Sequence, residues 1–133
     1  MRQLLDTDTF SYVLNGREPI ATRARAYVEE AGRFSISLIT FYEALRGLKF
    51  SQAAAKLERF ERFAQTNEII VLDISICRVA ADLHATLRRR GQLLPDADLL
   101  IAATALARGY TLVTRNTGHF ERVPNLQLEN WAS

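Results

Sequence analysis

Several acidic side chains stand beside apolar stretches, where a carboxylate is unusual. Asp6 directly follows a short apolar run near the N-terminus, and Glu43 lies inside a helical apolar pattern. Asp96 and Asp98 precede a stretch, Leu99–Ala107, that contains almost no polar residue. Carboxylate oxygens are the hard ligands that suit Mg²⁺ or Mn²⁺. A cation held by such residues can orient a phosphate, lower the pKa of a bound water and stabilise the leaving oxygen of a hydrolysis.

Two of these acidic positions can also be explained by a structural role that involves no catalysis. Asp8 or Thr9 can cap a short helix over Phe10–Leu14, and Asp8 is better placed for this than Asp6. Asp8 is therefore expected to be structural, and Asp6 remains the candidate ligand at the end of its strand. A glutamate on a helix usually faces solvent, which is the simplest interpretation of Glu43 on its spacing alone.

The pair Asp96 and Asp98 is only partly explained by helix capping. One acid at a helix start gains roughly 0.3–1 kcal/mol from the helix dipole. The helix that follows is apolar nearly all round, so its start is expected close to the edge of a sheet. A carboxylate held there needs a partner, which a divalent cation would supply.

The composition is that of an ordinary globular protein, and 133 residues predict a single domain over 1–133. No apolar run reaches the roughly 18 residues of a membrane span, and an acid at position 6 interrupts any signal-peptide core. One cysteine, Cys77, allows no internal disulfide or Cys-based zinc site and is expected to be buried. These features favour the cytoplasm. Net charge is only +2, so the excess of arginine over lysine is weak support for a nucleic-acid partner.

Strand-like and helical patterns alternate along the chain, which predicts an α/β fold with a mostly parallel sheet covered on both faces. The expected strands are Leu4–Leu5, Phe34–Ser37, Ile69–Leu72, Thr111–Val113 and Leu126–Glu129. The expected helices cover Phe10–Leu14, Pro19–Ala31, one from Leu38, one from Ser51, one capped by Ser75, and the apolar stretch that ends before Gly109. Ligands of such sheets bind at the carboxyl ends of the strands, where Asp6 and the loop Thr114–Asn116 fall.

Three segments of the sequence resemble the PIN-domain ribonucleases, specifically the VapC-type toxins of bacterial toxin–antitoxin pairs. LLDTDTFSYVL resembles the first motif of that family, with its acid at Asp6, and SLITFYEALRGL the second, with its acid at Glu43. DLLIAATALARGYTLVTRNTGHFERVPNLQLENW resembles the third and closing motifs, with the acid at Asp98. The three motifs in this order cover nearly the whole chain.

The resemblance implies a three-layer α/β/α fold and a Mg²⁺- or Mn²⁺-dependent endoribonuclease that acts on RNA. It also implies a homodimer and inhibition by a small cognate antitoxin of the VapB type. The implied metal ligands and catalytic acids are Asp6, Glu43 and Asp98, because the family acid directly precedes the apolar run that here begins at Leu99. In this mechanism the cation presents a water for in-line attack on the phosphate, and no protein nucleophile is needed.

The loop after the last buried strand departs from some relatives, which carry a fourth acid where this chain has Asn116. Asparagine can orient a metal-bound water or contact phosphate, but it brings no charge, so a full second metal site is in doubt. Thr114 is a hydrogen-bonding companion of the site, and Arg115 is a candidate to bind the scissile phosphate or its neighbour. A structured RNA such as tRNA would suit recognition by shape and exposed bases.

Other functions remain open on the sequence alone. LLDTDTF also fits the opening of a haloacid-dehalogenase-type phosphatase, with Asp6 as nucleophile and Asp8 as acid, but the only lysines, Lys49 and Lys56, are not late in the chain. A receiver-like domain would accept a phosphoryl group on Asp73 and also wants a late lysine. A degenerate PIN domain would bind only RNA or a protein partner.

Overall fold

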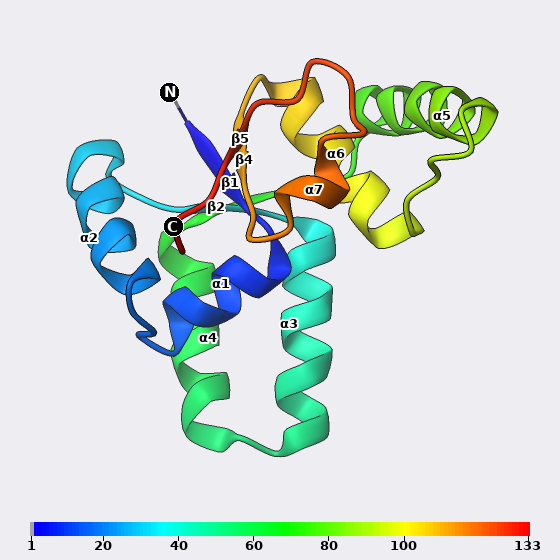
Figure 1. The fold of residues 1–133 in the computed structure, drawn as a ribbon. Helices are drawn as coiled ribbons and strands as arrows, with labels where there is room; N and C mark the ends of the chain where they lie inside the picture. Colours follow the sequence, from blue (N-terminus) through cyan, green and yellow to red (C-terminus); the bar gives the residue numbers. More distant parts are fainter. Residues whose placement is uncertain (1) are drawn as a thin grey trace.

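A parallel sheet forms the centre of the computed structural model, which describes residues 2–133 (Figure 1). Its five strands have the order β3-β2-β1-β4-β5, and every neighbouring pair is parallel. The strands are β1 (Gln3–Leu5), β2 (Ser35–Ser37), β3 (Glu68–Ile70), β4 (Thr111–Val113) and β5 (Leu128–Glu129). The central strand β1 is paired on both sides, with Leu5 opposite Ile36 of β2 and Val113 of β4. The predicted parallel sheet is confirmed.

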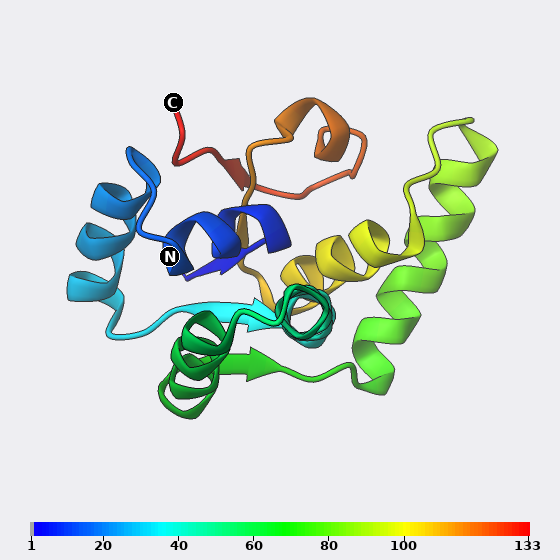
Figure 2. The same cartoon turned by 90° about the horizontal axis from the view of Figure 1, so that it is seen from below.

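Helices cover both faces of this sheet. They are α1 (Thr7–Leu14), α2 (Ile20–Ala31), α3 (Leu38–Ser51), α4 (Ala54–Thr66), α5 (Ile74–Arg89), α6 (Asp96–Arg108) and α7 (Thr117–Phe120). Successive residues of β1 point to opposite faces, so Leu4 packs with α5 and α6, whereas Leu5 packs with α1, α2 and α4. Figure 2 shows α5 and α6 on the side of the molecule away from α2. The fold therefore has the three α/β/α layers that the resemblance implies.

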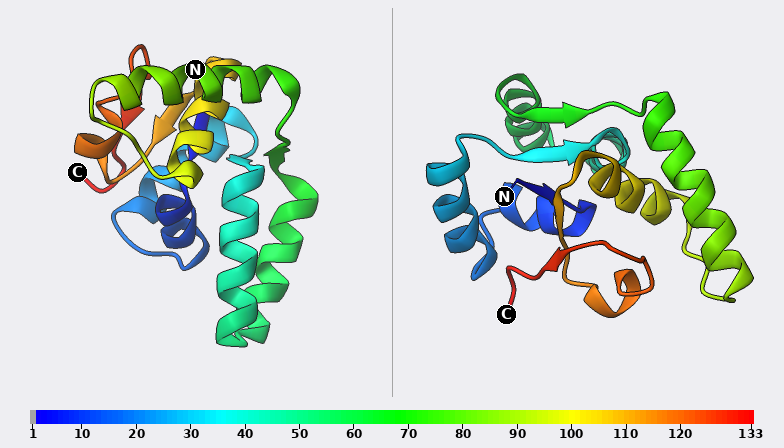
Figure 3. Two further views of the ribbon diagram at one scale, coloured as in Figure 1. Left: turned by 90° about the vertical axis from the view of Figure 1, so that its right-hand side faces the viewer. Right: turned by 90° about the horizontal axis from the view of Figure 1, so that it is seen from above.

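Two helices extend beyond the sheet as an antiparallel pair. Figure 3 shows α3 and α4 running side by side away from the strands, joined by a short turn at their far ends. Gln52 in this turn has a left-handed backbone, with φ of 55°, and it ends α3. The prediction that Ser51 begins the next helix is wrong, because Ser51 closes α3 and α4 begins at Ala54.

Two other helix starts also differ from the prediction. The α1 helix begins at Thr7, because the Asp6 carboxylate accepts the Thr9 N–H at 2.9 Å, and the expected capping role of Asp8 is therefore wrong. Asp73 caps α5 in place of Ser75, since its Oδ1 accepts the Ile76 N–H at 2.9 Å.

The outer helix α5 presents one apolar stripe to α6. Cys77 lies off this stripe and is exposed, so its expected burial is wrong. By contrast, α6 is buried on most sides, as its sequence predicts. None of the helices in the described part of the chain is long and apolar enough to cross a bilayer.

Candidate active site

The candidate residues lie at the carboxyl edge of the sheet, where the chain leaves β1, β2 and β4. Asp6 follows β1 directly, and Glu43 is in the second turn of α3, which begins where β2 ends. Asp98 is in the first turn of α6, which runs back along the sheet before β4, so its start lies at the same edge (Figure 1). Thr114 and Asn116 follow β4. The topology thus brings segments far apart in sequence to one edge.

Asp6 is the most buried of the three acids, at 8% exposed. Burial raises the pKa of its carboxyl, whereas hydrogen bonds from Thr114 and Thr9 oppose this rise. Among residues 2–133, no Lys, Arg or His nitrogen lies within ion-pair distance of this carboxylate. The ionised form is therefore desolvated without a cationic side chain beside it, which favours the approach of a cation.

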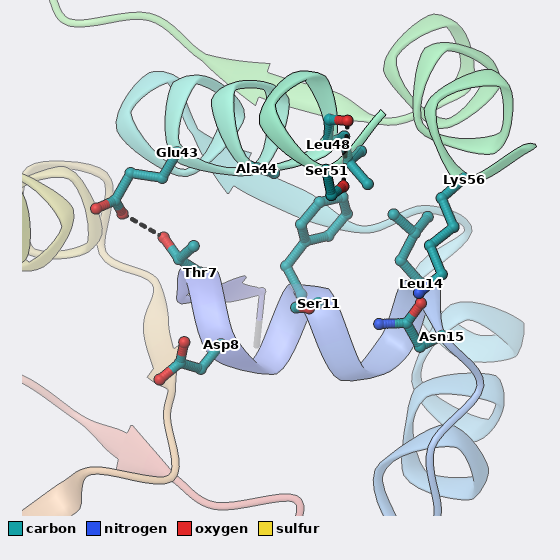
Figure 4. A pocket seen from close by; sticks show the side chains of 12 residues that line it. Thr7, Asp8, Ser11, Leu14, Asn15, Glu43, Ala44, Leu48, Ser51 and Lys56 are labelled. Atoms are coloured by element: carbon teal, nitrogen blue, oxygen red, sulfur yellow. Dashed lines mark hydrogen bonds between the residues drawn. The ribbon is translucent and has the colours of Figure 1, made fainter. Parts of the chain in front are cut away.

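Glu43 crosses from α3 toward α1 instead of facing open solvent. Its Oε1 accepts a hydrogen bond from the Thr7 hydroxyl at 2.6 Å, as Figure 4 shows. The Arg46 guanidinium lies 3.7 Å from the other oxygen, and the Glu43 side chain is 21% exposed. Since Thr7 is the residue after Asp6, this bond holds the second acid next to the first.

Asp98 and Asp96 differ in their surroundings. The Oδ2 atom of Asp98 lies 3.0 Å from Nε2 of His119, which belongs to α7. Asp96 is exposed on the same helical turn. The sequence gave no sign of this pairing, because Asp98 and His119 lie 21 positions apart, on either side of β4. Of the two acids, Asp98 is therefore the one that a residue of another element holds in place at the edge of the sheet.

The loop after β4 supplies two polar groups near Asp6. Thr114 is fully buried; its hydroxyl hydrogen-bonds the Asp6 carboxylate and accepts the Asn116 N–H at 2.9 Å. Asn116 is exposed and caps α7 by position. Arg115 turns toward α1, where its Nη1 donates to the Tyr12 hydroxyl.

The possible metal ligands are carboxylate oxygens, which suit a hard divalent cation. One of these carboxylates, Asp6, is buried and has no cationic side chain beside it within residues 2–133. In the described part of the chain, no three acid, histidine or cysteine side chains are close enough together to form a metal site. Two of the three carboxylates are held by neighbouring side chains, Glu43 by Thr7 and Asp98 by His119. The acids therefore share an edge without forming a closed ligand set.

A cleft of about 270 Å³ opens beside Glu43, the one candidate ligand that lines it. Figure 4 shows it between α1 and α3, with Thr7, Asp8 and Glu43 at one end and Lys56 of α4 at the other. The lining is mixed, because Leu14 and Leu48 contribute apolar surface between the polar ends. An extended chain that reached the acids could lie along this cleft.

Comparison with protein families matches residues 4–126 to the PIN domain. The chain belongs to the PIN domain family. Within it, this PIN domain is similar to ribonuclease VapC1 of Methanocaldococcus jannaschii, with 36% identity over 77% of the chain and 73% of that protein. It is 29% identical to the tRNA(fMet)-specific endonuclease VapC of Shigella flexneri, over 99% of both chains. The family that the three motifs indicate is confirmed.

Solved structures give the same result for the fold. This PIN domain superposes with a TM-score of 0.88 and 28% identity on a chain of VapBC2 from Rickettsia felis bound to a DNA fragment from its promoter, covering 98% and 99% of the two chains. With DNA-bound VapBC from Salmonella typhimurium the TM-score is 0.86 at 30% identity, covering 98% of each chain. Both of these structures are of VapBC bound to DNA.

The two phosphoryl-transfer alternatives find no support in this arrangement. Asp73 caps α5, and its Oδ2 lies 2.9 Å from the Arg108 guanidinium, so it is a paired structural acid. Lys49 belongs to α3 and Lys56 to α4, away from the sheet. Asp8 is exposed.

Proposed function

We propose that this VapC-type PIN domain is the toxin of a VapBC pair and hydrolyses RNA phosphodiester bonds with Mg²⁺ or Mn²⁺ held by Asp6, Glu43 and Asp98. The observation that carries the proposal is the buried Asp6 carboxylate, which has no cationic neighbour in the described chain and lies at the edge shared with the other acids. When bound, the cation supplies a polarised phosphate oxygen and a water of lowered pKa.

The chain's own residues would hold this arrangement in place. Thr114 and the Thr9 N–H fix the orientation of the Asp6 carboxylate, and Thr7 fixes that of Glu43. His119 does the same for Asp98. Such outer partners of metal ligands typically matter 10–100-fold in affinity or activity.

The loop residues would act on the substrate. The Asn116 amide can hydrogen-bond the attacking water or a phosphate oxygen, but it adds no charge to the three acids. Arg115 is exposed and carries a fixed positive charge for the RNA backbone. No side-chain nucleophile is required, because water attacks the phosphorus in line with the leaving oxygen.

The relatives indicate a substrate and a partner to test first. The proteins of Shigella flexneri and Salmonella typhimurium are named tRNA(fMet)-specific endonucleases, so we propose tRNA as the substrate class. Because the solved relatives are VapBC complexes, we also propose a small VapB-type antitoxin as inhibitor. We propose a homodimer as the toxin's own state, as the family resemblance implies.

The decisive experiment compares Asp98→Asn with its matched control Asp96→Asn on purified tRNA. Cleavage should require Mg²⁺ or Mn²⁺, stop with EDTA, and fall more than about 100-fold in Asp98→Asn, beyond the range for outer partners. The Asp96→Asn variant should stay within about twofold of the parent, because Asp96 is exposed. RNA binding without cleavage in either metal would instead indicate a degenerate PIN domain.

A further inference from the structure

We propose that Tyr12, Arg17 and Arg115 form a binding site for a backbone phosphate of RNA, next to the scissile one. This proposal rests on the proposed function for the position of the scissile phosphate. The two guanidinium carbons each lie 4.8 Å from the centre of the Tyr12 ring. One aromatic ring thus holds two positive charges together at the surface.

The end of α1 builds the first half of this site. Gly16 has a left-handed backbone with φ of +66°, and the Gly16 N–H donates to the Val13 carbonyl at 3.1 Å. The Arg17 N–H donates to the Tyr12 carbonyl at 2.9 Å. These two bonds make a Schellman motif, in which the residue after the glycine contacts the residue five positions earlier. That contact is usually apolar, but here it sets the Arg17 guanidinium on the Tyr12 ring.

The second half comes from the other end of the chain. Arg115 follows Thr114, which is buried and hydrogen-bonded to Asp6, so its backbone is fixed relative to the acids. Its side chain reaches Tyr12 and donates to the phenol oxygen. The ring is therefore contacted by two arginines that lie 98 residues apart in the sequence (115 minus 17).

Neither arginine is neutralised within the described part of the chain. No carboxylate lies within ion-pair distance of Arg17 or Arg115, in contrast to Arg23 and Arg108, which each contact one. Glu18 is the nearest acid in sequence, but its oxygens accept from the Thr22 N–H and hydroxyl and from Arg25. Two unneutralised like charges on one ring are expected where an anion binds.

The space between these side chains suits a phosphate. A hollow of about 180 Å³ is lined by Tyr12, Arg17 and Arg115, with Glu18, Pro19, Ile20 and Ala132 completing its wall. A hollow of this size holds several waters, so it can admit a solvated phosphate. The planar guanidinium offers paired donors to phosphate oxygens, which makes arginine the preferred residue for this contact.

The loop after β4 relates the hollow to the acids. Arg115, which lines the hollow, directly follows Thr114, whose hydroxyl hydrogen-bonds the Asp6 carboxylate. A strand whose scissile phosphate lay at the acids would therefore pass the hollow with a neighbouring phosphate. The site would then position the RNA backbone without reading its bases.

The test measures how salt weakens RNA binding. In an Asp6→Asn background, which prevents cleavage, a fluorescent single-stranded RNA is titrated at several salt concentrations and its anisotropy recorded. Each phosphate contact to a single strand contributes about 0.7 to the slope of log Kobs against log salt. The double variant Arg17→Gln/Arg115→Gln should reduce the slope by about 0.7, because the two arginines together bind one phosphate. The matched control Arg88→Gln/Arg89→Gln removes equal charge at the exposed end of α5 and should leave the slope unchanged.

Two further variants distinguish charge from folding. Arg17→Lys/Arg115→Lys keeps both charges, so its slope should stay within about 0.3 of the parent, less than half of one phosphate contact. Circular dichroism should show the same unfolding temperature for all variants. Equal slopes for the Arg17/Arg115 and Arg88/Arg89 pairs would overturn the proposal. The proposal would also be overturned if Arg17→Gln/Arg115→Gln left the slope unchanged but abolished binding of the antitoxin, since the site would then serve a protein partner.

Activity separates this inference from the proposed function. If the parent cleaves RNA, the Arg17→Gln/Arg115→Gln pair should raise KM and leave kcat within about twofold, as expected for a contact made equally before and during the reaction. The other outcome is that the parent binds RNA but never cleaves it, while the Arg17→Gln/Arg115→Gln variant shows the expected loss of slope. In that case the proposed function fails and the phosphate site stands.

Discussion

Replacing Asp6 by asparagine should separate the structural role of this residue from its proposed catalytic role. The Asp6 carboxylate caps α1 by accepting the Thr9 N–H at 2.9 Å, and an asparagine oxygen caps a helix equally well. The variant should therefore fold, while its loss of charge removes a ligand from the proposed cation site. Cleavage should fall more than about 100-fold, beyond the usual effect of an outer partner.

The difference in stability between the parent and this variant should depend on pH in a defined direction. Burial raises the pKa of Asp6 in the folded protein, so the parent binds this proton more tightly when folded. The parent's stability from this group is complete below the unfolded pKa, about 3.9, and is lost as pH rises through the raised folded pKa. The asparagine amide cannot ionise, so Asp6→Asn should equal or exceed the parent in stability at neutral pH.

A third variant measures the cap alone. Asp6→Ala removes the charge and also the oxygen that accepts the Thr9 N–H. It should be less stable than Asp6→Asn by about 1 kcal/mol, the usual value of such a cap. For a domain of this size that corresponds to about 4 °C in unfolding temperature.

Added Mg²⁺ should reverse the order of stability between parent and Asp6→Asn. At ten times its Kd, a ligand of the folded state stabilises by about 1.4 kcal/mol, or about 5 °C here. The parent should show this shift in thermal unfolding and the variant should not. An equal shift in both proteins would refute the assignment of Asp6 as a ligand, and unfolding of Asp6→Asn at room temperature would refute the analysis of the cap.

The other predictions concern the second acid, its partner, the core and one turn. Glu43→Gln should keep the acceptor for Thr7 and the unfolding midpoint in urea, yet lose more than about 100-fold in cleavage. Thr7→Val should lose only about 10–100-fold, measured in the same assay. Phe60→Ala should cost about 3–5 kcal/mol in urea unfolding, because Phe60 is fully buried against Phe10. Gly16→Ala should lower the free energy of unfolding by about 1–2 kcal/mol, because the backbone there has φ of +66°. The new Cβ would meet no other atom, so no steric clash adds to this loss.

The sequence was most reliable where strands are buried on both faces. Thr111–Val113 is the strand that was predicted, because it lies inside the sheet and both faces are covered. The run Ile69–Leu72 instead became β3, Glu68–Ile70, at the edge of the sheet. There the pairing with β2 decides which residues belong to the strand, and Val71 beyond it is 58% exposed.

Helix starts were harder to predict because several polar residues compete for each cap. In Asp6-Thr7-Asp8-Thr9 any of the four side chains could accept the first free N–H groups, and only the end of β1 selects Asp6. At α5 the same competition lies between Asp73 and Ser75, and here the Ser75 hydroxyl instead donates to Asp73 at 2.7 Å. Local sequence offers the candidates, while tertiary position decides among them.

The partners of the acids could not be derived from spacing. The bonds from Thr7 to Glu43 and between His119 and Asp98 join residues 36 and 21 positions apart, on elements whose packing the alternating pattern leaves open. Hydrophobic periodicity indicates that a helix has a buried face, but not which neighbour covers it. The contact of Arg115 with Tyr12, across 103 positions, depends on the same unknown.

The charge balance of this edge favours a single cation at the acids. Asp6, Glu43 and Asp98 bring three negative charges when ionised, and one divalent cation leaves a net charge of minus one, to which the neutral Asn116 adds nothing. A second divalent cation would leave an excess of positive charge unless the exposed Asp8 or Asp96 also took part in holding it. Arg17 and Arg115 supply positive charge for a backbone phosphate of the RNA. Their proposed contact with that phosphate does not depend on the metal. Metal titration of the parent should therefore give one tight site, and the salt dependence of RNA binding should persist when that metal is removed.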